Sequence, residues 1–263
     1  MIVKDSVVVV TGGGSGIGRA LCEVFAEAGA RIVVAADLDL GRAQETANAL
    51  RGVALRCDVG REEDVRGLIE TVEAQHGPID LFCSNAGIGT AFDMSFDNAA
   101  GAANEDWQRA WSVNVMAHVY AARHLVPSMK RRGRGHFLQT ISAAGLLSQI
   151  GSAVYSTTKH AAVGFAENLA ITHRNDGIRV SILCPQAVDT PMLAGLPDGP
   201  QSMDGVMSAR DVARITLEGV ERDAFLILPH EQVADYMRRK TADYDRWIGG
   251  MAKLNKQFAP SQS

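Results

Sequence analysis

Residues 7–10 of this chain read Val-Val-Val-Val and lead directly into a glycine-rich turn. Four β-branched residues in a row suit a strand that is buried on both faces of a parallel sheet. The turn reads Thr11-Gly12-Gly13-Gly14-Ser15-Gly16-Ile17-Gly18, and a helical pattern follows it. Glycines let a backbone approach a pyrophosphate closely, but this spacing differs from the common G-x-G-x-x-G pattern. The turn alone therefore does not identify a nucleotide site.

A carboxylate further along the chain strengthens the evidence for a nucleotide site. The first helix is expected to begin near Ser15 and Gly16, where its free N–H groups and the positive end of its dipole would face an anion. Asp37 stands nineteen residues after Gly18, at the end of a second apolar run. Dinucleotide folds place at this point a carboxylate that binds ribose hydroxyls. The two features together predict a dinucleotide site.

Short apolar runs alternate with helical patterns along the whole chain. The runs lie at residues 7–10, 31–36, 53–57, 80–84, 136–141, 178–184 and 224–228, and helices are expected at 16–29, 39–51, 61–76, 104–131, 152–174 and 208–222. This alternation predicts the α/β class, with a Rossmann-like, doubly wound sheet of seven parallel strands in a single domain. In such sheets ligands bind beyond the carboxyl ends of the strands, where all the candidate motifs lie.

Three segments depart from this alternation, and the first is a long polar and alanine-rich connection at residues 89–105. Residues 189–207 are rich in Pro, Gly and Met, and long connections at the carboxyl edge of a sheet are usually functional. Residues 231–256 place apolar side chains at helical spacing, which predicts an amphipathic terminal helix. We expect residues 1–230 to form the dinucleotide-binding domain with 189–207 as its substrate loop. Residues 231–263 would form a helix and tail packed on the same domain or on a neighbouring subunit, or a detached helix that binds a partner.

Composition argues against several classes of protein. The net charge of −4 opposes a general affinity for nucleic acid, and the basic stretch 130–134 sits at a predicted helix end, where cations complement the dipole. No apolar run approaches the ~20 residues that span a bilayer, so we expect a cytoplasmic protein with no membrane partner. The four cysteines and seven histidines lack metal-ligand spacing, so we expect buried free thiols and no metal site.

Tyr155 and Lys159 stand four residues apart in one predicted helix, and Ser142 precedes the tyrosine by thirteen residues. Positions i and i+4 share a helix face, so the phenol and the ammonium can lie side by side. A free tyrosine titrates near ~10, and a neighbouring cation favours the phenolate that could act as a base. Such pairs are also common on solvated helices, so this pair gains its meaning from the dinucleotide motif.

Six motifs in order resemble the short-chain dehydrogenase/reductase family over residues 5 to about 230. They are Thr-Gly-x-x-x-Gly-Ile-Gly at 11–18, Cys57-Asp58-Val59, Asn85-Ala86-Gly87, Asn114, Ser142 and Tyr155-x-x-x-Lys159. The resemblance implies an alcohol dehydrogenase or carbonyl reductase that acts on a small-molecule alcohol or ketone.

The resemblance also implies catalytic roles. Tyr155 would be the general acid/base on the substrate oxygen, and Ser142 would hydrogen-bond that oxygen. Lys159 would hold the nicotinamide ribose and stabilise the phenolate, while Asn114 would position a water that relays protons to the lysine. Taken singly, Ser142 could be a turn residue and Asn114 could face solvent.

The cofactor follows from Asp37 and from the family's usual arrangement. The Asp37 carboxylate can accept both hydroxyls of an adenosine ribose but would sit against a 2′-phosphate, which predicts NAD over NADP. Arg19 and Arg42 lie near in sequence and keep NADP open, and Asp37 or Asp39 could instead cap the next helix. The expected cofactor contacts are Gly12, Ser15, Gly16, Ile17, Gly18, Asp37, Asp58, Val59, Asn85, Ala86, Gly87, Tyr155, Lys159, Pro185, Val188 and Thr190.

Two departures from the family pattern bear on the substrate. Gln186 follows Pro185 where the family commonly has glycine, so a side chain can enter the site. The last strand is followed by His230 and a long amphipathic tail in place of a short ending. The loop at 189–207 carries the apolar residues Met192, Leu193, Leu196, Met203, Val206 and Met207. Thioethers and leucines line adaptable pockets, so we expect a mainly apolar secondary alcohol or ketone.

Assembly and alternative functions complete the prediction. The helix at 152–174 is apolar nearly all round, which suggests a contact with a second subunit, and the resemblance implies a homodimer or homotetramer. A dinucleotide-binding sensor or scaffold without catalysis is the alternative function, although it would not need an acid/base phenol. A nucleotide-sugar epimerase would want a larger substrate domain after residue 185.

Overall fold

The Val7–Val10 run lies at the centre of a parallel sheet in the computed structural model, which describes residues 1–93, 97–194 and 199–258. Strand β1 (Val7–Thr11) pairs with β2 (Ile32–Asp37) on one side and with β4 (Leu81–Ser84) on the other, and all five of its residues are buried. The remaining strands are β3 (Val53–Arg56), β5 (Gly135–Thr140), β6 (Ile178–Leu183) and β9 (Leu226–Ile227). Their order, β3-β2-β1-β4-β5-β6-β9, confirms the predicted seven-stranded, doubly wound sheet.

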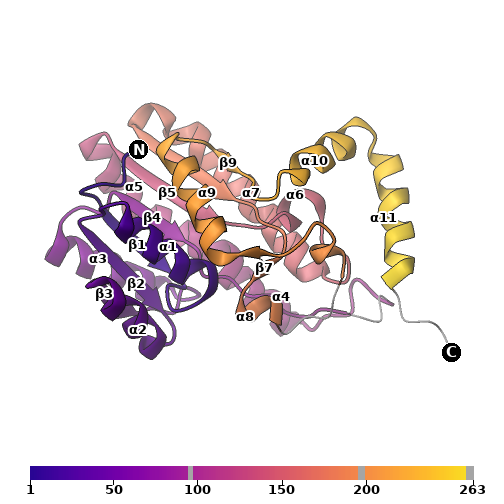
Figure 1. Ribbon diagram of the computed structural model, residues 1–263, viewed down its shortest axis with the longest axis horizontal. Coiled ribbons are helices and arrows are strands. Elements are labelled where there is room, and N and C mark those ends of the chain that lie inside the picture. The colour runs from indigo at the N-terminus through magenta and orange to yellow at the C-terminus, as the bar shows by residue number, and fades with distance from the viewer. Residues whose placement is uncertain (94–96, 195–198, 259–263) are drawn as a thin grey trace.

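Helices cover both faces of this sheet (Figure 1). The helices α1 (Gly16–Glu27) and α9 (Ala209–Glu221) pack with each other on one face, where α2 (Leu40–Leu50) also lies. The other face is covered by α3 (Glu62–His76), α5 (Ala117–Arg132) and α7 (Ala153–His173). Each of these helices follows a strand and returns the chain to the edge of the sheet where the strands begin. The carboxyl ends of β1, β4, β5 and β6 consequently meet at one edge.

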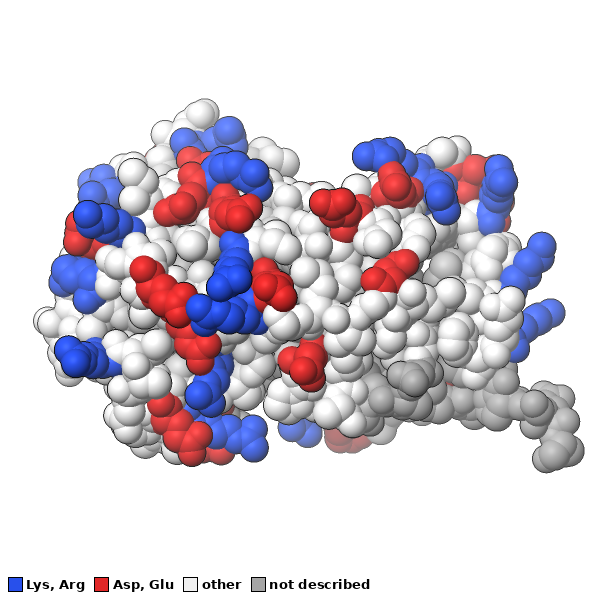
Figure 2. All heavy atoms as spheres, viewed as in Figure 1, with Lys and Arg blue, Asp and Glu red and all other residues white. Residues whose placement is uncertain are grey.

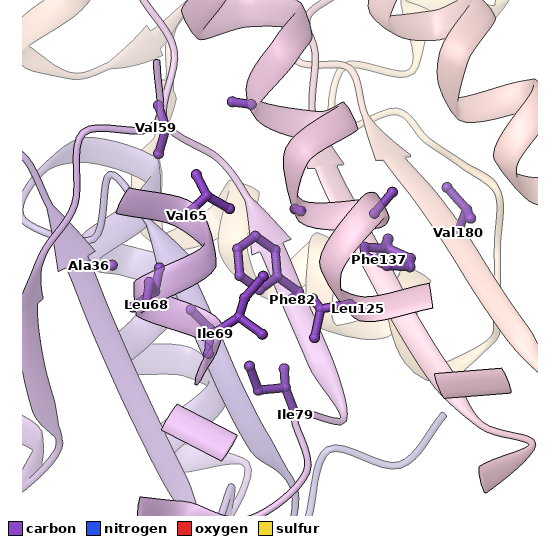
Figure 3. Packing of buried hydrophobic residues seen from close by; sticks show 14 of the residues in the cluster. Ala36, Val59, Val65, Leu68, Ile69, Ile79, Phe82, Leu125, Phe137 and Val180 are labelled. Carbon is purple, nitrogen blue, oxygen red and sulfur yellow. The ribbon is translucent and has the colours of Figure 1, made fainter. Parts of the chain in front are cut away.

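The core between the sheet and α3 and α5 holds this edge in place. Figure 3 shows Phe82 of β4 and Phe137 of β5 beside Leu125 of α5, with Ile69 of α3 next to them. Each of these four side chains is at most 3% exposed. Burying a side chain of this size stabilises a fold by about 1.5–3 kcal/mol, so the strands that end at the site are firmly anchored.

The segment predicted as one helix at 104–131 has three parts. They are α4 (Asn104–Trp111), the π-helical turn η1 (Ser112–Met116) and α5. A π-helical turn inserts one extra residue into a helix and is frequent at functional sites. This one contains Asn114.

The terminal segment also differs from the prediction, because it forms two helices. These are α10 (Gln232–Ala242) and α11 (Tyr244–Phe258). Asp243 between them has extended backbone, and its carboxylate accepts a hydrogen bond from the N–H of Arg246 at 2.9 Å. Asp243 therefore caps a new helix, which is a role that aspartate favours. Val233 of α10 is buried against Leu147, whereas α11 has no buried residue and stands apart from the sheet (Figure 1).

Several short elements were not predicted. Strands β7 (Val188–Asp189) and β8 (Met207–Ser208) pair in parallel and join the two ends of the substrate loop. The short helices are α6 (Ala144–Leu147), α8 (Pro191–Ala194), η2 (Arg174–Asp176) and η3 (Pro200–Ser202). Leu196 of the predicted substrate loop lies outside the described residues. No helix within the described ranges is long and apolar enough to cross a membrane.

Candidate active site

The glycine turn after β1 is packed backbone against backbone. A side chain at Gly18 would overlap the carbonyl oxygen of Gly12, which itself has a φ of +66°. Asn85 fixes the turn to the end of β4, since its Nδ2 donates to the Thr11 carbonyl at 3.0 Å. The Thr11 hydroxyl accepts hydrogen bonds from the backbone N–H groups of Asn85 and Ala86. The Asn85 side chain thus holds the turn in shape.

The N-terminus of α1 suits an anion. Ser15 is the N-cap but makes no side-chain capping hydrogen bond, and the first turn contains no acidic residue. Ser15, Gly16 and Ile17 all line a cavity of about 930 Å³. Uncapped N–H groups and the positive end of the helix dipole there fit a pyrophosphate, and the close-packed glycines leave it room.

Asp37 lies at the end of β2 and lines the same cavity. Its two oxygens accept hydrogen bonds from the backbone N–H groups of Gly14 and Asp39, each at 3.0 Å. The cap of α2 is Asp39, whose carboxylate accepts from the Arg42 N–H at 3.2 Å. The two aspartates therefore divide the roles that the sequence left open. Asp37 holds its carboxylate beside the glycine turn, and Asp39 caps the helix.

Tyr155 and Lys159 lie in the first two turns of α7, with the Lys159 Nζ 5.5 Å from the centre of the Tyr155 ring. The hydroxyl of the N-cap Ser152 accepts from the Tyr155 N–H at 3.3 Å, so the tyrosine sits near the positive end of the helix dipole. The Lys159 ammonium is buried and donates to the Thr140 carbonyl at 3.2 Å. This bond ties α7 to the end of β5.

Ser142 follows β5, where it is both a turn residue and part of the cavity wall. Its hydroxyl accepts from the Ala144 N–H at 3.1 Å, as in a turn, and approaches the Pro185 carbonyl at 3.4 Å. It also hydrogen-bonds the Tyr155 phenol and lines the cavity. Its φ of 152° lies in a region that residues with side chains rarely adopt, and such backbone strain is typical of active sites.

Burial is the largest influence on the pKa values of Tyr155 and Lys159. It raises the pKa of Tyr155 above its ordinary value, and the hydrogen bond with Ser142 opposes that shift only in part. Burial also lowers the pKa of Lys159 to about 8. The expected effect of the lysine on the phenolate stays a prediction. Burial is the largest influence on the pKa of Tyr155, because removing a charged group from water is costly.

Asn114 is completely buried within the π-helical turn, so it does not face solvent. Its Oδ1 accepts from the Ile88 N–H and its Nδ2 donates to the Ile88 carbonyl, both at 2.9 Å. The Nδ2 also lies 3.2 Å from the Thr158 hydroxyl. A Cβ built on Gly87 would lie 3.3 Å from the Lys159 Nζ and 3.4 Å from the Asn114 Oδ1. The lysine and the asparagine thus approach the same point of the chain.

The fold gathers the predicted residues around one cavity. Its lining includes Ser142 and every expected cofactor contact, whereas Asn114 lies behind the wall. Thr190 lies next to the start of α1, because its Cγ2 would lie 3.0 Å from a Cβ built on Gly16. Of the apolar loop residues named above that the structure describes, Met192, Leu193 and Met203 line the cavity, and Val206 and Met207 do not.

Sequence reasoning missed a polar cluster on the substrate side of the cavity. Gln186 Nε2 donates to Asp204 at 2.9 Å, and the Tyr236 hydroxyl donates to the other oxygen of Asp204 at 2.9 Å. All three residues line the cavity, with Arg239, Trp247, Met251 and Leu254 from the terminal helices. The unusual Gln186 was a signal for this cluster. Nothing in the sequence pointed to Asp204.

The remaining candidate groups are structural. All four cysteines are buried and free, as predicted, and burial raises the pKa of Cys22, Cys57 and Cys184 to about 12 and that of Cys83 well above 9.0. They are therefore poor nucleophiles. Within the described residues, no group of three or more His, Cys, Asp or Glu side chains is placed to hold a metal ion.

Fold and site together define a dinucleotide-binding α/β protein with a tyrosine and a buried lysine side by side in its cavity. Residues 6–201 match the family model of the short chain dehydrogenases. The chain is 37% identical over 257 residues to 1-deoxy-11-beta-hydroxypentalenate dehydrogenase of Streptomyces exfoliatus, and the match covers 94% of this chain and 91% of that protein.

Solved structures agree with this match. A short chain dehydrogenase/reductase from Burkholderia phymatum in complex with NAD superposes with a TM-score of 0.83 at 28% identity, covering 93% of this chain and 96% of that one. A 3-ketoacyl-(acyl-carrier-protein) reductase from Brucella melitensis complexed with NADH gives a TM-score of 0.79 at 27% identity, covering 86% and 96%. The chain belongs to the short-chain dehydrogenase/reductase family of oxidoreductases.

Proposed function

We propose that this protein is an NAD(H)-dependent dehydrogenase that interconverts a mainly apolar secondary alcohol and its ketone. The observation that carries the proposal is the placement of Ser142, Tyr155 and Lys159 in one cavity with the glycine turn. A sensor without catalysis would not need a buried lysine beside a tyrosine. The relatives support the same chemistry, since they are named as a dehydrogenase and a reductase and one of them is complexed with NADH.

The mechanism follows from the positions of these side chains. A nicotinamide dinucleotide bound along the glycine turn would supply or accept the hydride. During oxidation Tyr155 takes the proton from the substrate hydroxyl, and during reduction it returns a proton to the carbonyl oxygen. Ser142 donates a hydrogen bond to the same oxygen and so keeps it beside the phenol. Lys159 stabilises the phenolate when the tyrosine is deprotonated. Asn114 lies behind the lysine, and its side chain would position a water that relays protons to Lys159.

The preference for NAD rests on Asp37. Its carboxylate is held beside the glycine turn by two backbone N–H groups, so it can accept ribose hydroxyls but would repel a phosphate. Arg42, whose Cβ would lie 2.7 Å from a Cβ built on Gly14, approaches Asp39 at 3.4 Å. The remaining expected contacts, from Asp58 to Thr190, follow the length of the cavity and would hold the rest of the dinucleotide.

The test is formation of reduced nicotinamide from NAD, and separately from NADP, with secondary alcohols graded in size and polarity. We expect turnover with NAD and the larger apolar alcohols. Turnover of small charged hydroxy acids alone would contradict the apolar substrate. Tight NAD binding with no turnover of any alcohol would favour the sensor.

We also propose a cytoplasmic homodimer or homotetramer that uses the outer face of α7. A Cβ built on Gly164 would meet nothing within 4 Å, and Ile171 on the same helix is 79% exposed. Such a face of small and apolar residues suits close contact with a second copy. Gly164→Arg should therefore give a folded monomer by light scattering. A wild-type protein that is monomeric at micromolar concentration would contradict this assembly.

A further inference from the structure

The terminal helices form the substrate end of the cavity. Tyr236 and Arg239 of α10 and Trp247, Met251 and Leu254 of α11 line the same cavity as Tyr155. Figure 1 shows these helices at the opposite end of the molecule from α1, which opens at the glycine turn. A substrate bound at Tyr155 and extending away from the dinucleotide would meet them. Both helices lie beyond the family match at 6–201, so the family motifs do not describe their side chains.

A continuous series of contacts leads from the catalytic serine to Arg239. The Ser142 hydroxyl approaches the carbonyl of Pro185, and the next residue, Gln186, donates to Asp204. Asp204 accepts from Tyr236, whose ring centre lies 5.9 Å from the Arg239 guanidinium carbon. The series places Arg239 on the same wall as the reacting groups but several side chains away. A substrate would have to span that interval.

Arg239 has a guanidinium without a carboxylate partner. Among the described residues no acidic oxygen lies within 4.0 Å of it, whereas its neighbour Arg238 forms an ion pair with Asp235. Asp204 is the acidic residue closest along this wall, but both of its oxygens already accept hydrogen bonds from Gln186 and Tyr236. The five N–H donors of Arg239 are therefore free to bind a ligand, while its cation–π contact with Tyr236 limits its motion.

The surroundings of Arg239 combine positive charge with apolar surface. Between residues 232 and 258 the chain has six basic side chains and three acidic ones, although its net charge is −4 overall. Figure 2 shows Lys and Arg side chains over α10 and along the outer edge of α11. A field of this sign at the mouth of a cavity attracts anions, and the apolar side chains of α11 would exclude water from the contact.

We propose that Arg239 binds a carboxylate at the end of the substrate remote from the reacting carbon. The substrate class is accordingly an apolar hydroxy acid or keto acid whose skeleton packs against Trp247, Met251 and Leu254. This inference rests on the proposed function, because it takes the cavity as the site of alcohol oxidation. Arginine suits the role, since its planar fork matches a carboxylate with two parallel hydrogen bonds.

The test compares two ligands of one shape. Adamantane-1-carboxylate and adamantane-1-carboxamide share an apolar cage and differ in charge, and calorimetry measures their binding to the full-length protein with saturating NAD. We expect the carboxylate to bind about fivefold more tightly than the carboxamide in low salt, and this preference to shrink as salt is raised. Arg239→Met should remove the preference, whereas Arg239→Lys should retain part of it. Arg238→Met is the matched control and should leave the preference unchanged.

Three results would overturn the inference. Equal affinity of the wild-type protein for the two ligands would show that the cavity does not select an anion. If Arg238→Met and Arg239→Met weakened the preference for the carboxylate equally, the preference would come from the overall positive charge of α10 and not from Arg239. Failure of both ligands to bind would show that the cavity does not take an apolar anion. The proposed function is judged separately, by the formation of reduced nicotinamide with the panel of alcohols.

Discussion

The Lys159 Nζ lies 5.5 Å from the centre of the Tyr155 ring, one helical turn further along α7. The lysine is anchored from behind by the Thr140 carbonyl, and the phenol faces the cavity beside Ser142. The pair is thus fixed by two elements, α7 and β5, that meet at the carboxyl edge of the sheet.

Tyr155→Phe should abolish turnover while the protein still binds NAD. The variant keeps the ring and its packing but removes the group that carries the proton, and the loss of general acid/base catalysis costs about 10²–10⁴-fold in kcat. The measurement is steady-state NAD reduction together with calorimetry of NAD binding. Tyr120→Phe is the control, because Tyr120 lies on α5 outside the cavity lining. Retained activity in Tyr155→Phe would remove the tyrosine from the mechanism.

Asp37→Ala should shift the enzyme from NAD toward NADP. Removing the carboxylate takes away the ribose contact and the repulsion of a 2′-phosphate, so we expect kcat/KM to fall about tenfold for NAD, the equivalent of one hydrogen bond to a charged group. For NADP it should rise. Asp39→Ala separates this effect from helix capping. It should cost about 1 kcal/mol of stability, from the loss of the α2 cap, without a change in cofactor preference. An equal change of preference in both variants would contradict the role of Asp37.

Asn114→Ala should reduce stability and kcat together. The substitution leaves the partly buried N–H and carbonyl groups of Ile88 without partners, and each such group costs at most about 1–3 kcal/mol. Thr158→Val removes the third contact of Asn114 and the hydrogen bond from the Thr158 hydroxyl to the Tyr155 carbonyl, but it leaves both Ile88 groups paired, so it should have a smaller effect on both quantities. Chemical denaturation and kcat for the folded protein are the measurements. A destabilised variant with unchanged kcat would assign Asn114 a purely structural role.

The sequence predicted the sheet well because its strands are short runs of mostly apolar residues, and such runs indicate buried parallel strands wherever they occur. It could not predict β7 and β8, since two-residue strands have no periodicity to detect. The burial of Asn114 could not be predicted either, because its side chain pairs with Ile88, which is 26 residues away. The Gln186, Asp204 and Tyr236 cluster depends in the same way on contacts over 18 and 32 residues. The raised pKa of Tyr155 depends on burial, which motifs do not encode.

Deleting residues 244–263 should weaken the binding of large substrates with little loss of stability. The helix α11 has no buried residue, yet Trp247, Met251 and Leu254 line the cavity. We expect KM for bulky apolar alcohols to rise about tenfold, since losing three partly buried contacts removes roughly 1–2 kcal/mol of binding. For 2-propanol, which is too small to reach α11, kcat/KM should not change. A loss of activity toward both alcohols would show that α11 supports the catalytic residues themselves.

Lys159→Met should inactivate the enzyme but stabilise it at neutral pH. Burial lowers the pKa of Lys159 to about 8 from 10.5, and the side chain is 3% exposed. Below pH 8 the lysine is charged in both the folded and the unfolded chain, so the folded state bears the full cost of burying that charge. A shift of this size corresponds to about 1–3 kcal/mol after allowance for the lost hydrogen bond to Thr140.

The pH dependence gives this prediction its sign. Between pH 8 and 10.5 the unfolded chain binds more protons than the folded one, so the free energy of unfolding of the wild-type protein gains from Lys159 as pH rises. The advantage of Lys159→Met should therefore be largest below pH 8 and should shrink toward pH 10.5. Urea denaturation of the two proteins at pH 7, 9 and 10 measures it. A variant that is less stable than the wild type at pH 7 would show that the lysine's contacts outweigh the cost of burying its charge.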